Sequence, residues 1–358
     1  MSSFAGIFRL PSFRALLVAC AVLAAAVTWL SAAPVTSGAK MPKTHRYYWG
    51  AWIDTHVNGT QPPWDMSAVK TVESRLGKRM SLIEFGTPMT GPEGRNPFTF
   101  PAAQFDAIRR HGSIPFFSWS THAMRNYGHR SFTLRAIANG SMDELIETWA
   151  AAARVYGKPF FLRFNWEMNG DWFPWSERYG DNQPGEYVAA WRHVHDIFER
   201  AGVTNATWVW CPVADPKRDM QPLAKLYPGD RYVDWTGIDA YNGGAPWRTL
   251  SGVIRATYRE IVKIAPAKPM VLGEVGSTES GGNKAKWIRG MFTSLPRDFP
   301  KMRAVIWFDS AKVGPGGHRD WVLDSSASAQ RAFGRAVAGK EFHGNQFGDL
   351  SGGRIPLP

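Results

Sequence analysis

The chain has 358 residues, of which 44% are hydrophobic, 13% aromatic and 20% charged. That length provides one large domain or two ordinary ones, and the 17 Trp and 21 Phe residues exclude a largely disordered chain. Only two cysteines occur, Cys20 and Cys211, which excludes a disulfide framework and a Cys-rich zinc site. The formal charge of +12 comes from scattered Lys and Arg residues, so the sequence predicts no nucleic-acid partner.

The N-terminal segment has the composition of an export signal. Arg9 and Arg14 precede an uncharged, mostly apolar run from Ala15 to Ala33, and small residues and Pro34 follow it. A run of about 19 residues is also long enough to cross a bilayer that is roughly 30 Å thick. We therefore expect residues 1–40 to be a cleaved signal peptide or an N-terminal membrane anchor. The protein is accordingly expected to be secreted, or anchored in a membrane and facing outside.

From residue 47 onward, short apolar runs alternate with amphipathic stretches. The runs predict buried strands at Tyr47–Ile53, Met80–Phe85, Ser113–Trp119, Phe160–Trp166, Ala206–Cys211, Trp235–Tyr241, Pro269–Val275 and Ala304–Phe308. The periodicity predicts helices at Ala68–Leu76, Ala102–His111, Met142–Tyr156, Glu186–Ala201, Val253–Ile264, Lys284–Leu295 and Ala327–Val337.

Eight such strands indicate an α/β protein with a (β/α)₈ TIM barrel in residues 41–340. A doubly wound sheet is the alternative, but no Gly-rich phosphate-binding sequence follows the first strand. Residues 341–358 are rich in Gly and Pro and lack a helical pattern, so we expect a loosely packed C-terminal tail.

Two acidic residues follow strands that would lie on opposite sides of the barrel. Glu167 comes at the end of the fourth strand and Glu274 at the end of the seventh. Catalytic groups of (β/α)₈ enzymes lie at these carboxyl ends of the strands. A pair of carboxyl groups there is what glycoside hydrolysis requires: one protonates the leaving oxygen, and the other attacks the sugar or activates water.

The neighbours of the two acids predict opposite protonation states. Glu167 lies among aromatic residues such as Trp172, and an apolar environment favours the protonated carboxyl group. Glu274 ends a buried strand, where Arg163 and Tyr241 are suitable donors to keep it ionised. The sequence thus predicts an acid and a nucleophile.

Four motifs on these strands resemble glycoside hydrolase family 26, which contains β-mannanases and belongs to a clan of retaining (β/α)₈ glycosidases. The matching segments are RFNWEMNGDWFPW (163–175), YPGDRYVDWTGIDAY (227–241), VLGEVG (271–276) and IWFD (306–309). By this resemblance Glu167 matches the general acid/base of the family and Glu274 its nucleophile. The resemblance also implies an endo-acting glycosidase that needs no cofactor and no metal.

The same resemblance implies roles for residues around the two acids. Arg163 occupies the position of an arginine four residues before the acid/base, and Tyr241 matches a tyrosine that hydrogen-bonds the nucleophile. Trp172 and Trp307 match aromatic residues that line the sugar subsites. All four are therefore expected in the substrate-binding site.

Two departures from the family pattern bear on the sugar that is bound. The residue before the acid/base is a histidine in well-known mannanases and Trp166 here, and Asn165 is a candidate to replace that histidine. Val213 follows the fifth strand where an asparagine is expected. Trp119 and His122, close after the third strand, are further candidates for sugar contact.

The sequence leaves several functions open. The leading one is hydrolysis of β-1,4-mannan. The alternatives are the same fold acting on mixed-linkage β-glucan, β-1,3-xylan or a cell-wall or exopolysaccharide glycan, and a non-catalytic polysaccharide-binding barrel. His193 and His195 do not predict a metal site, because residues two apart on a helix face different directions. We expect a monomer whose partner is its polysaccharide substrate.

Overall fold

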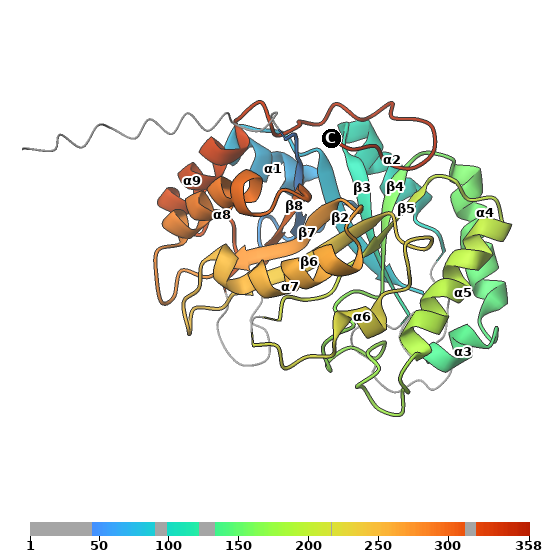
Figure 1. Ribbon diagram of the computed structural model, residues 1–358. Helices are drawn as coiled ribbons and strands as arrows, with labels where there is room; N and C mark the ends of the chain where they lie inside the picture. Colours follow the sequence, from blue (N-terminus) through green and yellow to red (C-terminus); the bar gives the residue numbers. More distant parts are fainter. Residues whose placement is uncertain (1–44, 90–98, 122–132, 216, 312–319) are drawn as a thin grey trace, which may run out of the picture. The chain divides into compact units, whose positions relative to one another are not determined.

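In the computed structural model, described here for residues 45–89, 99–121, 133–215, 217–311 and 320–358, eight parallel strands close into a barrel (Figure 1). Each strand pairs with its sequence neighbours, and β8 pairs with β1 to complete the ring. This confirms the predicted (β/α)₈ fold. The strands are β1 (Tyr48–Ile53), β2 (Leu82–Pro88), β3 (Ile114–Ser120), β4 (Phe160–Phe164), β5 (Ala206–Trp210), β6 (Trp235–Asn242), β7 (Met270–Ser277) and β8 (Met302–Asp309).

Helices surround the barrel, and all seven predicted ones are present with small differences at their ends. They are α1 (Ser67–Leu76), α2 (Ala102–His111), α4 (Asp143–Tyr156), α5 (Glu186–Arg200), α7 (Leu250–Ile264), α8 (Lys284–Asp298) and α9 (Ala327–Val337). Two short helices, α3 (Leu134–Ala138) and α6 (Leu223–Leu226), were not predicted. Both are too short to show a helical repeat in the sequence.

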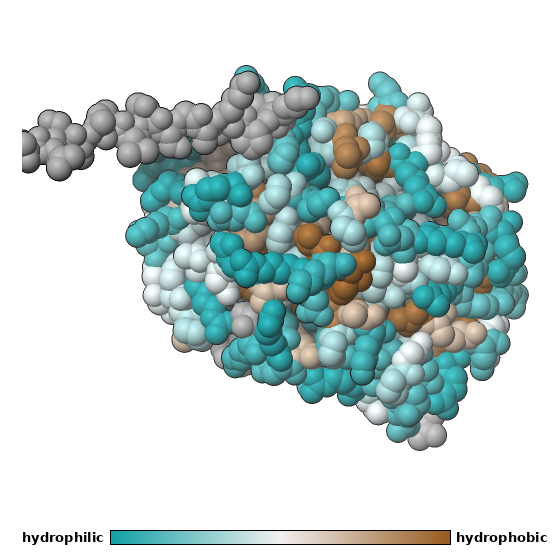
Figure 2. All heavy atoms as spheres, in the orientation of Figure 1, coloured by the Kyte–Doolittle hydropathy of each residue, from teal (hydrophilic) through white to brown (hydrophobic). Residues whose placement is uncertain are grey.

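The strands are apolar on both faces because each side of the barrel wall is covered. Side chains that point outward pack under the helices, and those that point inward fill the barrel. Four aromatic rings occupy the interior near the amino ends of the strands, where Phe161 contacts Tyr48, Phe116 and Trp235. Polar side chains cover most of the outer surface seen in Figure 2. This aromatic layer fills the barrel at the amino ends of the strands, so the ionisable groups inside the barrel lie toward the carboxyl ends.

The C-terminal tail differs from our expectation. Residues 341–358, red in Figure 1, run across the amino ends of the strands and are held there by specific contacts. Phe342 is buried against Tyr47, the Ile355 amide donates to Thr207 Oγ1 at 2.7 Å, and Tyr48 Oη donates to the Pro356 carbonyl at 3.2 Å. The prediction of a loosely packed tail was wrong, because turns and single apolar anchors replace a helical pattern here.

The predicted signal or anchor segment, residues 1–40, lies outside the described residues. Among the helices of the described part of the chain, none is long and apolar enough to cross a membrane.

Candidate active site

A bulge in β7 directs Glu274 into the barrel. Ile238 of β6 pairs with Leu272, but the next residue, Asp239, pairs with Glu274, so Gly273 is left without a partner in the register. A Cβ atom on Gly273 would lie 2.6 Å from Asp239 Oδ1 and 2.7 Å from the sulfur of Cys211. Only glycine fits this position, and the extra residue turns the Glu274 carboxylate toward the centre.

Arg163 holds the nucleophile candidate from below. Its Nη2 donates to Glu274 Oε1 at 2.5 Å and also to Glu84, while Nη1 donates to both oxygens of Asp239 at 3.0 and 3.1 Å. Its Nε donates to Ser118 Oγ at 2.9 Å. Burial alone would lower the pKa of Arg163, but the carboxylates of Glu84, Asp239 and Glu274 raise it. The guanidinium is therefore a fixed positive charge beneath Glu274.

The second oxygen of Glu274 accepts a short hydrogen bond from Tyr241 Oη. Burial, followed by the adjacent Glu274 charge, raises the pKa of Tyr241, so its hydroxyl stays protonated and donates. Both donors that the sequence predicted for Glu274 thus reach it, one on each oxygen. Arg163 and Tyr241 fix the orientation of the Glu274 carboxyl group.

An aromatic wall stands beside the nucleophile candidate. The Tyr241 ring packs against Phe308 of β8 and against Trp321, with ring centroids 5.8 and 5.0 Å away, and Phe308 stacks on Trp52 of β1 at 4.6 Å. Trp52, Phe308 and Trp321 were not among the predicted site residues. Flat apolar rings with exposed faces are the surfaces on which sugar rings stack.

Glu167 lies in a backbone turn that the sequence pattern does not predict. Asn165 and Glu167 have φ angles of 43° and 54°, in the region that side chains other than glycine rarely adopt. The Glu167 amide donates to the Cys211 carbonyl at 2.8 Å. The Asn169 side chain makes two 2.9 Å hydrogen bonds with the backbone of Val213. These bonds tie the segment after β4 to the one after β5, and so fix the position of Glu167.

Trp172 completes the surroundings of Glu167. Its indole Nε1 donates to Glu167 Oε2 at 2.8 Å, while the ring is 39% exposed. The ring lies back over Gly170, where a Cβ atom would come within 2.5 Å of it. Burial and the neighbouring Glu274 raise the pKa of Glu167 to about 8, against the opposing effects of the Trp172 hydrogen bond and Arg163. Glu167 is therefore protonated at neutral pH.

The two acids lie close enough for one sugar to contact both. Carboxylate oxygens of Glu167, Asp239 and Glu274 lie within 4.8 Å of one another. Retaining glycosidases keep their two carboxyl groups about 5–5.5 Å apart, whereas inverting ones leave room for a water molecule. The separation therefore fits a protonated Glu167 paired with a Glu274 that is held by two donors.

Two further carboxyl groups are buried near this pair. Burial raises the pKa of Glu84 to about 8 and raises the pKa of Asp239 well above its usual range.

Two predicted sugar-binding tryptophans face away from this site. Trp307 is 0% exposed and packs on Trp287 of α8 and Phe333 of α9, and its indole donates to the Trp321 carbonyl at 2.7 Å. Trp119 is likewise fully buried, stacked on Trp149 of α4. Both predictions were wrong, because successive strand residues alternate between the two faces and these two point outward.

The other predicted binding residues fall into different positions. Asn165 is fully buried, and its Oδ1 accepts from the Thr121 amide at 3.0 Å, so it supports the end of β3. Arg163 is also buried and donates to Glu274. Trp166 packs under the Arg163 guanidinium, 4.8 Å from the ring centroid, and keeps a small exposed edge. His122 lies outside the described residues.

Three acidic side chains in or next to other strands form hydrogen bonds and ion pairs between strands. Asp54 accepts from Ser310 Oγ and from His56, and His56 Nε2 lies 3.7 Å from Asp309. Burial raises the pKa of Asp309 to about 6, with His56 opposing the rise. Glu84, the third, pairs with Arg163. These groups link β1 to β8 and β2 to β4.

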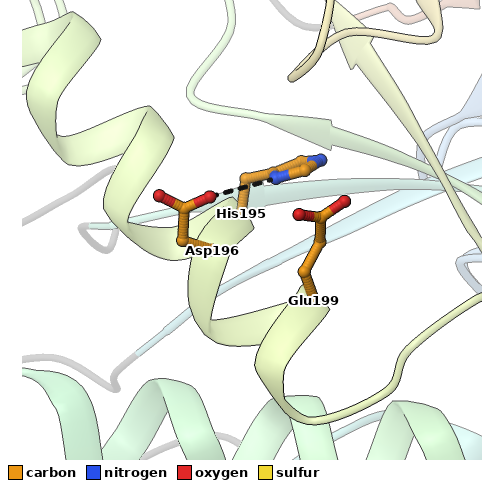
Figure 3. Close-up of side chains that lie close together, drawn as sticks. All are labelled: His195, Asp196 and Glu199. Carbon is orange, nitrogen blue, oxygen red and sulfur yellow. Dashed lines mark ion pairs between the residues drawn. The ribbon is translucent and has the colours of Figure 1, made fainter.

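A second cluster of ligand-type atoms lies on α5, far from these acids along the barrel wall. His195, Asp196 and Glu199 have ligand atoms within 4.8 Å of one another, and the buried His195 Nδ1 is 3.9 Å from Asp196 Oδ1 (Figure 3). Arg231 already places a cation there, 3.0 Å from Glu199 and 3.7 Å from Asp196. Because that charge balances the carboxylates, the cluster is an ion-pair group, and we assign no metal to it.

A closed barrel with one carboxyl group just after β4 and a second within β7 defines the class of (β/α)₈ glycoside hydrolases. The sequence profile of glycosyl hydrolase family 26 matches residues 132–288. Endoglucanase H of Acetivibrio thermocellus is 32% identical over 297 residues, covering 80% of this chain, and a mannan endo-1,4-beta-mannosidase of Bacillus subtilis is 28% identical over 180 residues, covering 47%. The chain belongs to glycosyl hydrolase family 26.

Solved structures of the family share the fold. The catalytic domain of an endo-β-1,4-mannanase from Bacillus sp. JAMB-750 superposes with a TM-score of 0.63 at 17% identity, covering 88% of this chain and 92% of that one. An endo-β-1,4-mannanase from Cellulomonas fimi gives 0.62 at 17% identity, covering 87% and 76%. The chain spans only 30% of Endoglucanase H and 46% of the B. subtilis mannosidase, so the activities of those whole proteins are not carried over directly.

Proposed function

We propose that this protein is a retaining endo-β-glycanase. The observation that carries the proposal is the pair of acids: Glu274 is held by Arg163 and Tyr241, and Glu167 lies opposite, with oxygen atoms of the two within 4.8 Å. A raised pKa of about 8 keeps Glu167 protonated at neutral pH, as a general acid requires.

In the proposed reaction, a Glu274 oxygen attacks the anomeric carbon while the bond from that carbon to the glycosidic oxygen breaks. Glu167 gives its proton to the departing oxygen. Glu167, now ionised, then takes a proton from water as the water oxygen attacks the same carbon and releases Glu274. Two inversions retain the configuration of the sugar.

The first substrate we propose is β-1,4-mannan, which the mannosidases among the relatives hydrolyse according to their names. Mixed-linkage β-glucan is a second candidate, for two reasons. Trp166, packed under Arg163, occupies the position before the acid/base where well-known mannanases have a histidine. The relative aligned over 80% of this chain is an endoglucanase by name.

Reducing-end release from mannan, mixed-linkage β-glucan and β-1,3-xylan tests the proposal. Glu274→Ala should abolish the activity, and Glu144→Ala, an exposed acid on α4, should leave it unchanged. Full activity in Glu274→Ala would reject the nucleophile assignment. Binding without turnover on every polymer would instead favour a non-catalytic polysaccharide-binding barrel. NMR of the first-formed anomer distinguishes retention from inversion.

We also propose that the enzyme acts outside the cytoplasm as a monomer. The charged, apolar and small-residue order of residues 1–40 supports export, with or without removal of the apolar run Ala15–Ala33. Cell fractionation followed by N-terminal sequencing of the product distinguishes a released enzyme from an anchored one. Sedimentation velocity on the purified protein measures its oligomeric state.

A further inference from the structure

The charges of the described chain are divided between the two ends of the barrel. The amino end comprises the last turns of the long helices, the segments that lead from them to the next strand, residues 45–47, residues 227–234 and the C-terminal tail. It holds 17 Lys and Arg residues against 7 Asp and Glu, whereas the rest of the described chain holds 16 against 22. The basic residues at this end are Arg46, Arg75, Lys78, Arg79, Arg109, Arg110, Arg154, Lys158, Arg200, Arg231, Lys263, Lys268, Arg297, Lys301, Arg335, Lys340 and Arg354.

Part of this asymmetry has a local cause. Every long helix of the barrel carries a basic residue in its last turn, where the partial negative charge of the helix end favours a cation. Because all eight strands are parallel, all these helix ends meet at the same end of the barrel. The result is a basic face opposite the mouth that bears Glu167 and Glu274.

The basic face contains a groove between the C-terminal ends of α1 and α2. The groove has a volume of about 610 Å³ and is lined by Lys78, Arg79 and Arg110 of the basic face and by Lys70 from the first half of α1, among others. Its single lining carboxylate, Glu73, is already bonded to His111 and to the Met80 amide. None of the four cations forms an ion pair within the described part of the chain, so their charges are available to an outside anion.

We propose that this basic face docks on the phosphate head groups of an anionic lipid bilayer, with the groove of Lys70, Lys78, Arg79 and Arg110 as its main contact. A bilayer fits better than a soluble polyanion because the apolar N-terminal run is connected to the barrel at the basic face. The apolar run Ala15–Ala33 is joined to β1 at this same end by residues 34–47. Fourteen residues reach at most about 50 Å when fully extended, so a bilayer that held the run would lie near this face.

The consequence is an orientation of the enzyme. The mouth with Glu167 and Glu274 faces away from the bilayer, toward polymers outside it, and the rest of the described chain, where acids outnumber bases, is kept off the anionic surface. This inference concerns the surface alone and does not depend on the sugar that is cleaved.

The test compares the full-length protein on vesicles of phosphatidylcholine alone and on vesicles with one quarter phosphatidylglycerol. The apolar run contributes to both, so the ratio of the two partition coefficients isolates the charge effect. One basic residue near an anionic surface contributes about fivefold to partitioning. The triple variant K78E/R79E/R110E removes three positive charges and adds three negative ones, so it should lower the ratio by at least about 100-fold. About 0.5 M NaCl should also lower the ratio of the wild type.

A matched variant, K217E/K286E/R289E, changes the net charge equally but lies outside the basic face. This matched variant should lower the ratio of partition coefficients far less than K78E/R79E/R110E does. The rate at which K78E/R79E/R110E hydrolyses soluble polymer should equal that of the wild type. Equal losses in both triple variants, or a ratio near one for the wild type, would overturn the proposal. So would binding to polyglycerol phosphate at the groove without any preference for anionic vesicles.

Discussion

The indole Nε1 of Trp172 lies 2.8 Å from Oε2 of Glu167 and donates a hydrogen bond to it. This bond favours the ionised carboxylate and so lowers the pKa of Glu167, while burial and Glu274 act in the opposite direction and prevail. One exposed aromatic residue therefore adjusts the protonation of the proposed general acid.

The pH at which the activity falls on the alkaline side should depend on the hydrogen bond between Trp172 and Glu167. Because Glu167 must be protonated to act as an acid, kcat/KM should fall as the pH rises through about 8. Trp172→Phe keeps an aromatic ring but removes the donor, so it should raise the pKa of Glu167 and move the alkaline limb to higher pH. Rate profiles from pH 5 to 10 measure the limb. Trp64→Phe, at an exposed tryptophan without this bond, should not move it, and a downward shift in Trp172→Phe would contradict the interpretation.

Tyr241 should act on the rate more than on binding. Tyr241→Phe removes the hydrogen bond to the Glu274 carboxylate. A hydrogen bond to a charged group is worth about 1.5–3 kcal/mol, which corresponds to a loss in kcat of roughly 10- to 100-fold. Initial-rate kinetics on a soluble polymer measure it. The matched control is Tyr227→Phe, which removes a 2.6 Å bond from a tyrosine to Asp230 and should leave kcat unchanged. A change in KM alone would show that Tyr241 only binds substrate.

The buried carboxyl groups make stability depend on pH. Burial raises the pKa of Glu84 to about 8 in the folded state, against about 4.5 when unfolded, so the folded protein binds the extra proton. Stability from this group is present below about pH 4.5 and is lost as the pH rises toward 8. Glu84→Gln should flatten this decline by up to about 1.4 kcal/mol per pH unit. Denaturant unfolding between pH 5 and 8 measures it, with Glu144→Gln as the control. An unchanged slope in Glu84→Gln would reject the assignment.

The sequence predicted the barrel because strand and helix periods are local properties that survive in any environment. It also predicted that Glu167 and Glu274 lie close together, since parallel strands bring their carboxyl ends to the same end of the barrel. It failed for Trp307, whose neighbour Phe308 faces the site instead. The alternation of side chains along a strand separates the two faces of that strand. It does not show which face points into the barrel when the residues on both faces are apolar. Only the packing of Trp307 on α8 and α9 decides that question.

The tail and the Glu167 turn were beyond the sequence for another reason. Residues 341–358 are held by single hydrogen bonds and isolated apolar anchors contributed by distant residues such as Tyr48 and Thr207. Likewise, the positive φ of Glu167 is maintained by a bond to the Cys211 carbonyl on another strand. Neither contact leaves a periodic trace in the local sequence, because both depend on tertiary neighbours.

The bulge at Gly273 gives the sharpest test of how the fold positions the nucleophile. A methyl group there would lie 2.6 Å from Asp239 Oδ1 and 2.7 Å from the Cys211 sulfur, so Gly273→Ala must displace the residues around Arg163. We expect a loss of about 1–3 kcal/mol in unfolding free energy, together with a large loss of kcat as Glu274 leaves its donors. Gly290→Ala, in α8 with nothing within 4 Å of the added carbon, should instead stabilise the protein by up to about 1 kcal/mol. Denaturant unfolding and kinetics on both variants separate the two effects. Wild-type activity in Gly273→Ala would mean that the bulge does not set the position of Glu274.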